Sequence, residues 1–139
     1  MSATVAPRPH VPSLILQLVR FGVVGATNTA LTLAAYAGLV ALHAPVPVAG
    51  AAGWGVGAVN GFILNRAWTF RGAARGAVPA ARYLAVQLMG SALNAALAAI
   101  AVGHAHLPRL AGELAVLPPV TIVTFVLCRT WVFARAVPA

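Results

Sequence analysis

The sequence predicts an all-α integral membrane protein with four transmembrane helices. Hydrophobic residues make up 61% of its 139 positions and charged residues only 7%, whereas about a quarter of the residues of a soluble domain are charged. The mean hydropathy is +0.92, and the apolar residues form four runs that can each cross a bilayer, which takes about 20 residues. A motif repeated at the ends of the second and fourth runs predicts that the chain consists of two related halves.

The repeated motif reads F-x-L-x-R-x-W-x-F and occupies residues 62–70 and 125–133. In both copies an Arg, a Trp and a Phe follow an apolar run, which is typical of a helix that leaves the bilayer at the level of the headgroups. The copies are 63 residues apart. This spacing is too long for a solenoid unit and suits a pair of membrane helices.

Residues 1–13 are predicted to be a flexible N-terminal tail, and residues 14–135 a transmembrane domain. The first span, at about residues 14–42, has no formal charge after Arg20. A signal peptide is the weaker alternative, because Arg20 interrupts the run that would form its apolar region. Pro45 and Pro47 then separate the first span from the second.

The other three spans are predicted at about residues 48–66, 83–103 and 110–128. Small residues recur every four positions in the second span and predict close packing against a neighbouring helix, and Gly90 begins a similar seam in the third. The fourth span contains Pro118-Pro119, which we expect to kink it. The predicted helix-packing glycines are Gly53, Gly57, Gly61 and Gly90.

The distribution of Arg residues predicts the orientation of the spans. Arg109 alone lies on one side of them, and the other eight Arg residues, which are Arg8, Arg20, Arg66, Arg71, Arg75, Arg82, Arg129 and Arg135, lie on the opposite side. Because positive loops stay in the cytoplasm, both termini are expected to be cytoplasmic. The spans then form two tandem helical hairpins in parallel orientation.

Four Arg residues occupy matching places in the two halves and are candidate phosphate ligands. The chain contains one acid, Glu113, on the other side of the membrane, so the counter-ions of these guanidinium groups should be external. Arg binds phosphate through two parallel hydrogen bonds, and lipid headgroups are expected partners rather than nucleic acid, despite a net charge of +8. The candidates are Arg20, Arg66, Arg82 and Arg129; simple anchoring of the helix ends is the alternative.

Asparagine side chains within or at the ends of the spans, Asn28, Asn60, Asn65 and Asn94, need polar partners in hydrocarbon. They could contact a substrate sugar, or they could form interhelical hydrogen bonds that hold the bundle together. His104, His106 and Glu113 give only a weak metal-binding pattern, so no metal site and no cofactor are predicted.

Residues 20–29, which read R-F-G-V-V-G-A-T-N-T, residues 62–70, and Arg82-Tyr83 with the second copy of the motif resemble the GtrA-like family of small four-span bacterial membrane proteins. The resemblance extends over about residues 14–135. Cys128 stands where the first half has Asn65, which departs from two-fold symmetry.

The resemblance implies a multi-pass protein of the bacterial inner membrane that acts in cell-surface or cell-wall polysaccharide synthesis. It implies flippase-like movement of polyprenyl-phosphate-linked sugars, without enzymatic activity, beside a membrane glycosyltransferase. A non-transporting adaptor that recruits the glycosyltransferase is the alternative, and a small-molecule exporter is disfavoured because no acid lies deep in the membrane. The transport path could be a groove open to lipid or could require a homo-oligomer, and anionic phospholipids are further expected partners.

Overall fold

The computed structural model describes residues 13–71, 73 and 76–134, apart from the side chains of Arg109, Leu110 and Glu113. It contains helices α1 (Leu14–Ala41), α2 (Val46–Leu64), α3 (Ala77–Gly103) and α4 (Arg109–Leu127), and no strand in the described ranges. A π-helical turn prolongs α2 as η1 (Asn65–Thr69), and a second prolongs α4 as η2 (Cys128–Val132). Most of the predicted flexible tail, together with Arg8, Arg75 and Arg135, lies outside the described residues.

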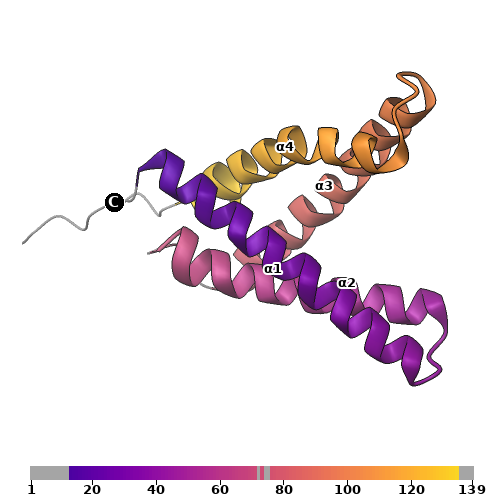
Figure 1. Cartoon of the computed structure of the whole chain (residues 1–139). Helices are drawn as coiled ribbons and strands as arrows, with labels where there is room; N and C mark the ends of the chain where they lie inside the picture. Colours follow the sequence, from indigo (N-terminus) through magenta and orange to yellow (C-terminus); the bar gives the residue numbers. More distant parts are fainter. Residues whose placement is uncertain (1–12, 72, 74–75, 135–139) are drawn as a thin grey trace, which may run out of the picture.

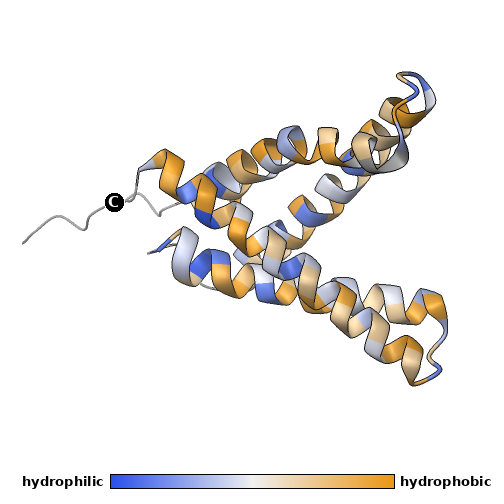
Figure 2. Ribbon diagram, in the orientation of Figure 1, coloured by the Kyte–Doolittle hydropathy of each residue, from blue (hydrophilic) through white to orange (hydrophobic). Residues whose placement is uncertain are grey.

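The predicted all-α class with four membrane-crossing helices is confirmed. The segments Leu14–Ala41, Val46–Thr69, Ala77–Gly103 and Leu114–Val132 are long and apolar enough to cross a membrane. Many of their large apolar side chains are exposed, including Ile15, Leu33, Ile63 and Leu88. Figure 2 shows hydrophobic residues along the length of all the helices, with hydrophilic residues near the helix ends and at a few positions within the helices. This distribution suits a surface that faces lipid tails.

Helix α1 packs along α2, and α3 packs along α4 (Figure 1). The two pairs meet at the end where α1 and α3 begin and where η1 and η2 lie, and they diverge toward the loops that connect α1 to α2 and α3 to α4. The contacts between the pairs join α1 to α4 and α2 to α3. Each half of the chain therefore contributes the same kinds of contact to the junction.

The turns within the two pairs repeat one another. Each contains a His-x-Pro sequence, in which His43 and His106 have positive φ angles of 62° and 52°. Pro45 and Pro108 then precede the first residue of α2 and of α4, with extended backbones that end the turn. The structural repeat therefore includes these turns as well as the span ends.

Prolines and a glycine explain where the helices begin. Pro47 and Pro79 lie in the first turns of α2 and α3, where a missing N–H leaves no intrahelical bond unmade. Gly76 has a φ of 124°, which favours glycine, and α3 begins directly after it, ahead of the predicted span start at about residue 83. Helix α4 stays helical through Pro118-Pro119, so the tandem proline does not end it.

A cluster of aromatic rings forms the core of the junction between the pairs. Six ring contacts among the described residues form three pairs that are equivalent when the two halves are exchanged. The pairs are Phe21 with Phe125 at 5.5 Å and Tyr83 with Phe62 at 5.6 Å; Phe21 with Phe70 at 6.2 Å and Tyr83 with Phe133 at 5.9 Å; and Phe70 with Phe125 at 5.8 Å and Phe133 with Phe62 at 5.9 Å. The seventh contact stacks Phe70 on its own equivalent, Phe133, at 5.1 Å. The aromatic core is therefore pseudo-two-fold symmetric.

Candidate functional site

Two of the four candidate Arg residues have the same partners in each helix pair. The guanidinium of Arg20 donates to the carbonyl oxygen of Trp68 at 3.3 Å and lies over the Trp68 ring at 5.4 Å. Arg82 donates to the carbonyl oxygen of Trp131 at 3.1 Å and lies 5.5 Å from that ring. Each Arg thereby supplies a donor to a carbonyl group in the last turn of a helix, where intrahelical donors run out. The remaining guanidinium donors can still face an anion.

The other two candidates, Arg66 and Arg129, lie on the π-helical turns. Arg66 is half-buried and Arg129 is exposed, and neither has a hydrogen bond or ion pair to the part of the chain that the structure describes. In each turn the N–H of the closing Phe donates five residues back, from Phe70 to Asn65 at 2.7 Å and from Phe133 to Cys128 at 2.8 Å. Turns of this kind are often found at functional sites.

The glycine seam of α2 faces α1 of the same chain. A Cβ added at Gly53 would lie 2.7 Å from the carbonyl oxygen of Thr32, and one at Gly57 would meet the Thr32 hydroxyl. One at Gly61 would meet both the Asn28 amide and the Tyr83 hydroxyl. The seam is therefore covered by α1 and, at Gly61, also by Tyr83 of α3, and it is not a free face for another protein.

Two of the candidate asparagines bind each other across this pair. The Asn60 amide donates to Oδ1 of Asn28 at 2.8 Å. Asn60 therefore forms an interhelical hydrogen bond, which was one of the two alternatives predicted for the asparagines. Asn28 also lines a cavity of about 350 Å³ between the two helix pairs, which we call the inter-pair cavity. Asn65 lines the same cavity, 2% exposed.

The lining of the inter-pair cavity comes from α1, η1, α3 and α4 and mixes apolar with polar side chains. Its residues are Phe21, Gly22, Gly25, Ala26, Asn28, Thr29, Asn65, Tyr83, Gln87, Leu117, Thr121 and Thr124. All of these are uncharged. A cavity with polar side chains within apolar spans is the kind of place where a hydrophilic group can enter the membrane.

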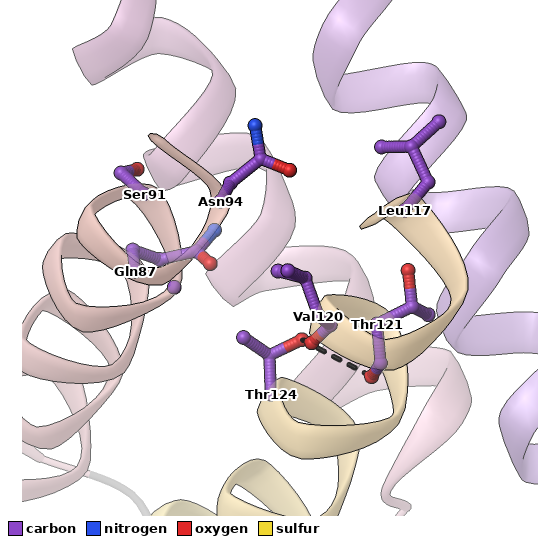
Figure 3. Close-up of a pocket in the computed structure, with 8 residues that line it drawn as sticks. Gln87, Ser91, Asn94, Leu117, Val120, Thr121 and Thr124 are labelled. Atoms are coloured by element: carbon purple, nitrogen blue, oxygen red, sulfur yellow. Dashed lines mark hydrogen bonds between the residues drawn. The ribbon is translucent and has the colours of Figure 1, made fainter. Parts of the chain in front are cut away.

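A second cavity, of about 330 Å³, lies between α3 and α4 and is called here the α3–α4 cavity. Figure 3 shows Gln87 extending from α3 toward α4, where Val120 and Thr124 lie. Asn94 lines this cavity and not the inter-pair cavity. The two cavities share Gln87, Leu117, Thr121 and Thr124, so they adjoin along one edge.

Sequence reasoning did not single out Tyr83 and Gln87 as site residues. Gln87 Nε2 donates to the Tyr83 hydroxyl at 3.0 Å, and Asn65 Nδ2 donates to the same oxygen at 3.4 Å. The three side chains thus form one polar chain in the wall of the inter-pair cavity, and only Gln87 also reaches the edge that this cavity shares with the α3–α4 cavity. The available signal was a Gln one helical turn after Tyr83 in a mostly apolar span.

The repeat does not extend to the polar residues. Gly90 occupies the place of Asn28, Thr124 that of Gly61, and Cys128 that of Asn65. In the α3–α4 pair the small residue is thus on the first helix, and a Cβ at Gly90 would lie 2.7 Å from a methyl carbon of Thr124. The predicted departure from two-fold symmetry therefore concerns the cavities and not the aromatic core.

Among the described residues, no group of three or more His, Cys, Asp or Glu side chains could hold a metal ion. The weak metal-binding pattern predicted from the sequence includes Glu113, whose side chain lies outside the described ones. The described site offers hydrogen-bonding groups in the cavities and cationic groups at the helix ends.

Comparison with known proteins identifies a family. Residues 20–133 match the family described as GtrA/DPMS, transmembrane domain, and no curated protein matches the chain. The family match and the four apolar helices make this a multi-pass membrane protein, and the match indicates involvement in glycosyl-lipid-related polysaccharide synthesis. Because the match includes both helix pairs and both copies of the repeated motif, the chain belongs to the GtrA/DPMS transmembrane-domain family.

Proposed function

We propose that this protein moves polyprenyl-phosphate-linked sugars between the leaflets of the bacterial inner membrane in a flippase-like manner. It would supply them for cell-surface or cell-wall polysaccharide synthesis. The movement involves no covalent chemistry, so the protein acts as a carrier and not as an enzyme. In this proposal both helix pairs cross the membrane in the same direction, with both termini in the cytoplasm.

The observation that carries the proposal is the inter-pair cavity, which places polar side chains between spans whose outer surfaces are apolar. A polyprenyl-phosphate-linked sugar also combines a polar and an apolar part, since its sugar requires polar contacts while its prenyl chain is as apolar as lipid. The cavity can enclose the sugar, and the prenyl chain can stay in the bilayer beside the exposed helix faces.

The phosphate is assigned to the helix ends. Arg66 and Arg129 have no ionic partner in the described part of the chain. Arg20 and Arg82 donate hydrogen bonds to Trp68 and Trp131, which lie two residues after Arg66 and Arg129. A phosphodiester would provide the missing counter-charge through charge-assisted hydrogen bonds. Anionic phospholipids carry the same group and would compete for these residues.

Reconstitution tests the proposal directly. The purified protein is placed in liposomes with a labelled polyprenyl-phosphate monosaccharide, and the lipid in the outer leaflet is measured with an impermeant oxidant. We expect protein-dependent transbilayer movement, which Arg66→Gln slows about tenfold, the effect of losing one charge-assisted hydrogen bond. Arg71→Gln, which changes an exposed Arg outside the repeated motif, is the matched control and should leave the rate unchanged. Movement equal to that in protein-free liposomes would refute the proposal.

The adaptor alternative makes a different prediction for the same variants. The glycine seam is covered by α1, so an adaptor would have to bind a glycosyltransferase through its lipid-facing helix surfaces. Arg66→Gln should then preserve both glycosyltransferase pull-down and polysaccharide synthesis. A variant that still binds the glycosyltransferase but no longer supports synthesis would exclude the adaptor.

A further inference from the structure

We infer that the inter-pair cavity binds a single uncharged sugar ring, and that Asn65, Tyr83 and Gln87 are the residues that select it. The inference rests on the proposed function, because it names the class of head group that the carrier would accept. It goes further by excluding sugars with an amino or a carboxylate group and by placing one sugar site in each chain.

The buried amide of Asn65 points to a ligand. The side chain is 2% exposed and lines the cavity, and its Oδ1 has no hydrogen-bond partner among the described residues. A buried carbonyl oxygen without a partner is unfavourable, and native proteins rarely leave one unexplained. A hydroxyl group of a sugar in the cavity would donate to this oxygen.

Tyr83 and Gln87 complete the polar surface. The Tyr83 oxygen accepts hydrogen bonds from Nδ2 of Asn65 and Nε2 of Gln87, so its own hydrogen is directed to another acceptor. The cavity thus presents the Asn65 oxygen as an acceptor and the Tyr83 hydroxyl as a donor. Sugar hydroxyl groups both donate and accept, which matches this alternation.

The charge of the lining determines the class of sugar. Every described residue that lines the inter-pair cavity or the α3–α4 cavity is uncharged. An ammonium or carboxylate group on the sugar would enter this space without a counter-ion and would lose its hydration. An uncharged sugar loses only hydrogen bonds to water, and the lining can replace them.

The size of the cavity and the asymmetry of the polar residues limit the number of sugars. A volume of about 350 Å³ is at the lower end of the range for small-molecule sites, about 300–1,000 Å³. Cys128, the equivalent of Asn65, is fully buried and lines neither cavity. The second half of the chain therefore lacks the acceptor that Asn65 provides, and one ring per chain follows.

Equilibrium binding tests the inference separately from transport. Short-chain polyprenyl phosphates that carry a neutral hexose, an aminohexose or a hexuronic acid, and the bare polyprenyl phosphate, are titrated into the full chain in nanodiscs. We expect the neutral glycolipid to bind at least about tenfold more tightly than the charged ones, since each charged sugar would lose its hydration without a counter-ion. Equal affinities for the three glycolipids would overturn the inference.

Two variants and a control locate the site. Asn65→Cys introduces the residue that the second half carries at this place, and Gln87→Leu keeps the side-chain size. Both should weaken binding of the neutral glycolipid about tenfold, the effect of one lost hydrogen bond, and leave binding of bare polyprenyl phosphate unchanged. Ser91→Ala, which alters only the α3–α4 cavity, is the control and should bind like the wild type.

The outcomes separate the inference from the proposed function. Selective binding of the neutral glycolipid without transbilayer movement would support the inference and refute the flippase. Transport of every lipid at one rate, with Asn65→Cys binding like the wild type, would support the flippase and overturn the inference.

Discussion

The guanidinium of Arg20 lies over the indole of Trp68, 5.4 Å from the ring centroid, and donates to the Trp68 carbonyl oxygen at 3.3 Å. This contact ties α1 to the π-helical turn that ends the neighbouring helix. It recurs between Arg82 and Trp131 in the second pair. Arg20 thus connects two helices of the fold and is also a candidate phosphate ligand.

Replacing Arg20 by Lys should show how much of its contribution to stability comes from the planar guanidinium group and how much from the positive charge. Lys keeps the positive charge, but it loses the planar group that stacks on Trp68 while donating to its carbonyl oxygen. We expect Arg20→Lys to lower the free energy of unfolding by about 1 kcal/mol, the usual size of a partly exposed cation–π contact. Denaturation in mixed micelles measures this, and Arg82→Lys should give a similar loss. Arg71→Lys is the control, and equal stabilities of all three variants would contradict the assignment.

The stacked pair at the centre of the aromatic cluster predicts equal effects in the two halves. Phe70 and Phe133 are repeat equivalents with ring centroids 5.1 Å apart. We expect Phe70→Ala and Phe133→Ala each to destabilise the protein by about 2 kcal/mol. This is less than in a soluble core because lipid is as apolar as the protein interior, so mainly packing is lost. The same denaturation assay measures it.

Ile63→Ala supplies the control for the aromatic variants. Ile63 belongs to the same repeated motif but is 56% exposed, on a lipid-facing surface. Its truncation should leave the stability within about 0.5 kcal/mol of the wild type. If only one of the two Phe variants were strongly destabilised, the two rings would contribute unequally to the free energy of unfolding, and the prediction would be wrong.

Two glycines on α2 should respond oppositely to a methyl group. A Cβ at Gly57 would meet the Thr32 hydroxyl and lie 3.1 Å from the Asn28 carbonyl oxygen, whereas a Cβ at Gly55 would meet nothing within 4 Å. Gly57→Ala should therefore destabilise the α1–α2 pair by about 1–3 kcal/mol through overpacking. Gly55→Ala should be neutral or slightly stabilising, because Ala favours helix. Melting curves in detergent decide this, and the same melting temperature for both variants would be incompatible with a packed seam.

The sequence allowed the spans, the repeat and the family to be predicted, because these depend on local composition and on motifs. Hydrocarbon thickness fixes the length of an apolar run, and F-x-L-x-R-x-W-x-F fixes the register of the two halves. The four-residue spacing of Gly57 and Gly61 also predicted a packed face. The sequence did not identify which helix covers that face, since a seam of small residues suits any neighbour.

The cavities could not be predicted, because they depend on which side chains face each other across helices. In one pair Asn28 on the first helix faces Gly61 on the second; in the other, Gly90 on the first helix faces Thr124 on the second. The π-helical turns were also missed, since five-residue hydrogen bonding leaves no clear mark in the sequence. The polar chain through Tyr83 therefore appears only when η1 and α3 are placed together.

The Asn28–Asn60 hydrogen bond gives the final prediction, since it tests whether an intramembrane amide pair stabilises this fold. The donor and acceptor are 2.8 Å apart and join α1 to α2. Asn28→Leu should leave the Asn60 amide without this acceptor, and Asn60→Leu should leave Asn28 without this donor, so each single change should destabilise the pair. The double variant should be less destabilised than the sum, because replacing both partners leaves neither group unpaired.

A double-mutant cycle on the free energy of unfolding measures this coupling. Hydrogen bonds between membrane helices average about 0.6 kcal/mol and reach about 1.7 kcal/mol. We expect a value in the upper part of that range, because the bond is short and each side chain is only partly exposed. Asn28 also lines the inter-pair cavity, so Asn28→Leu should weaken glycolipid binding more than Asn60→Leu does. Equal losses of binding in the two variants would mean that Asn28 acts through the helix pair alone and not through the cavity.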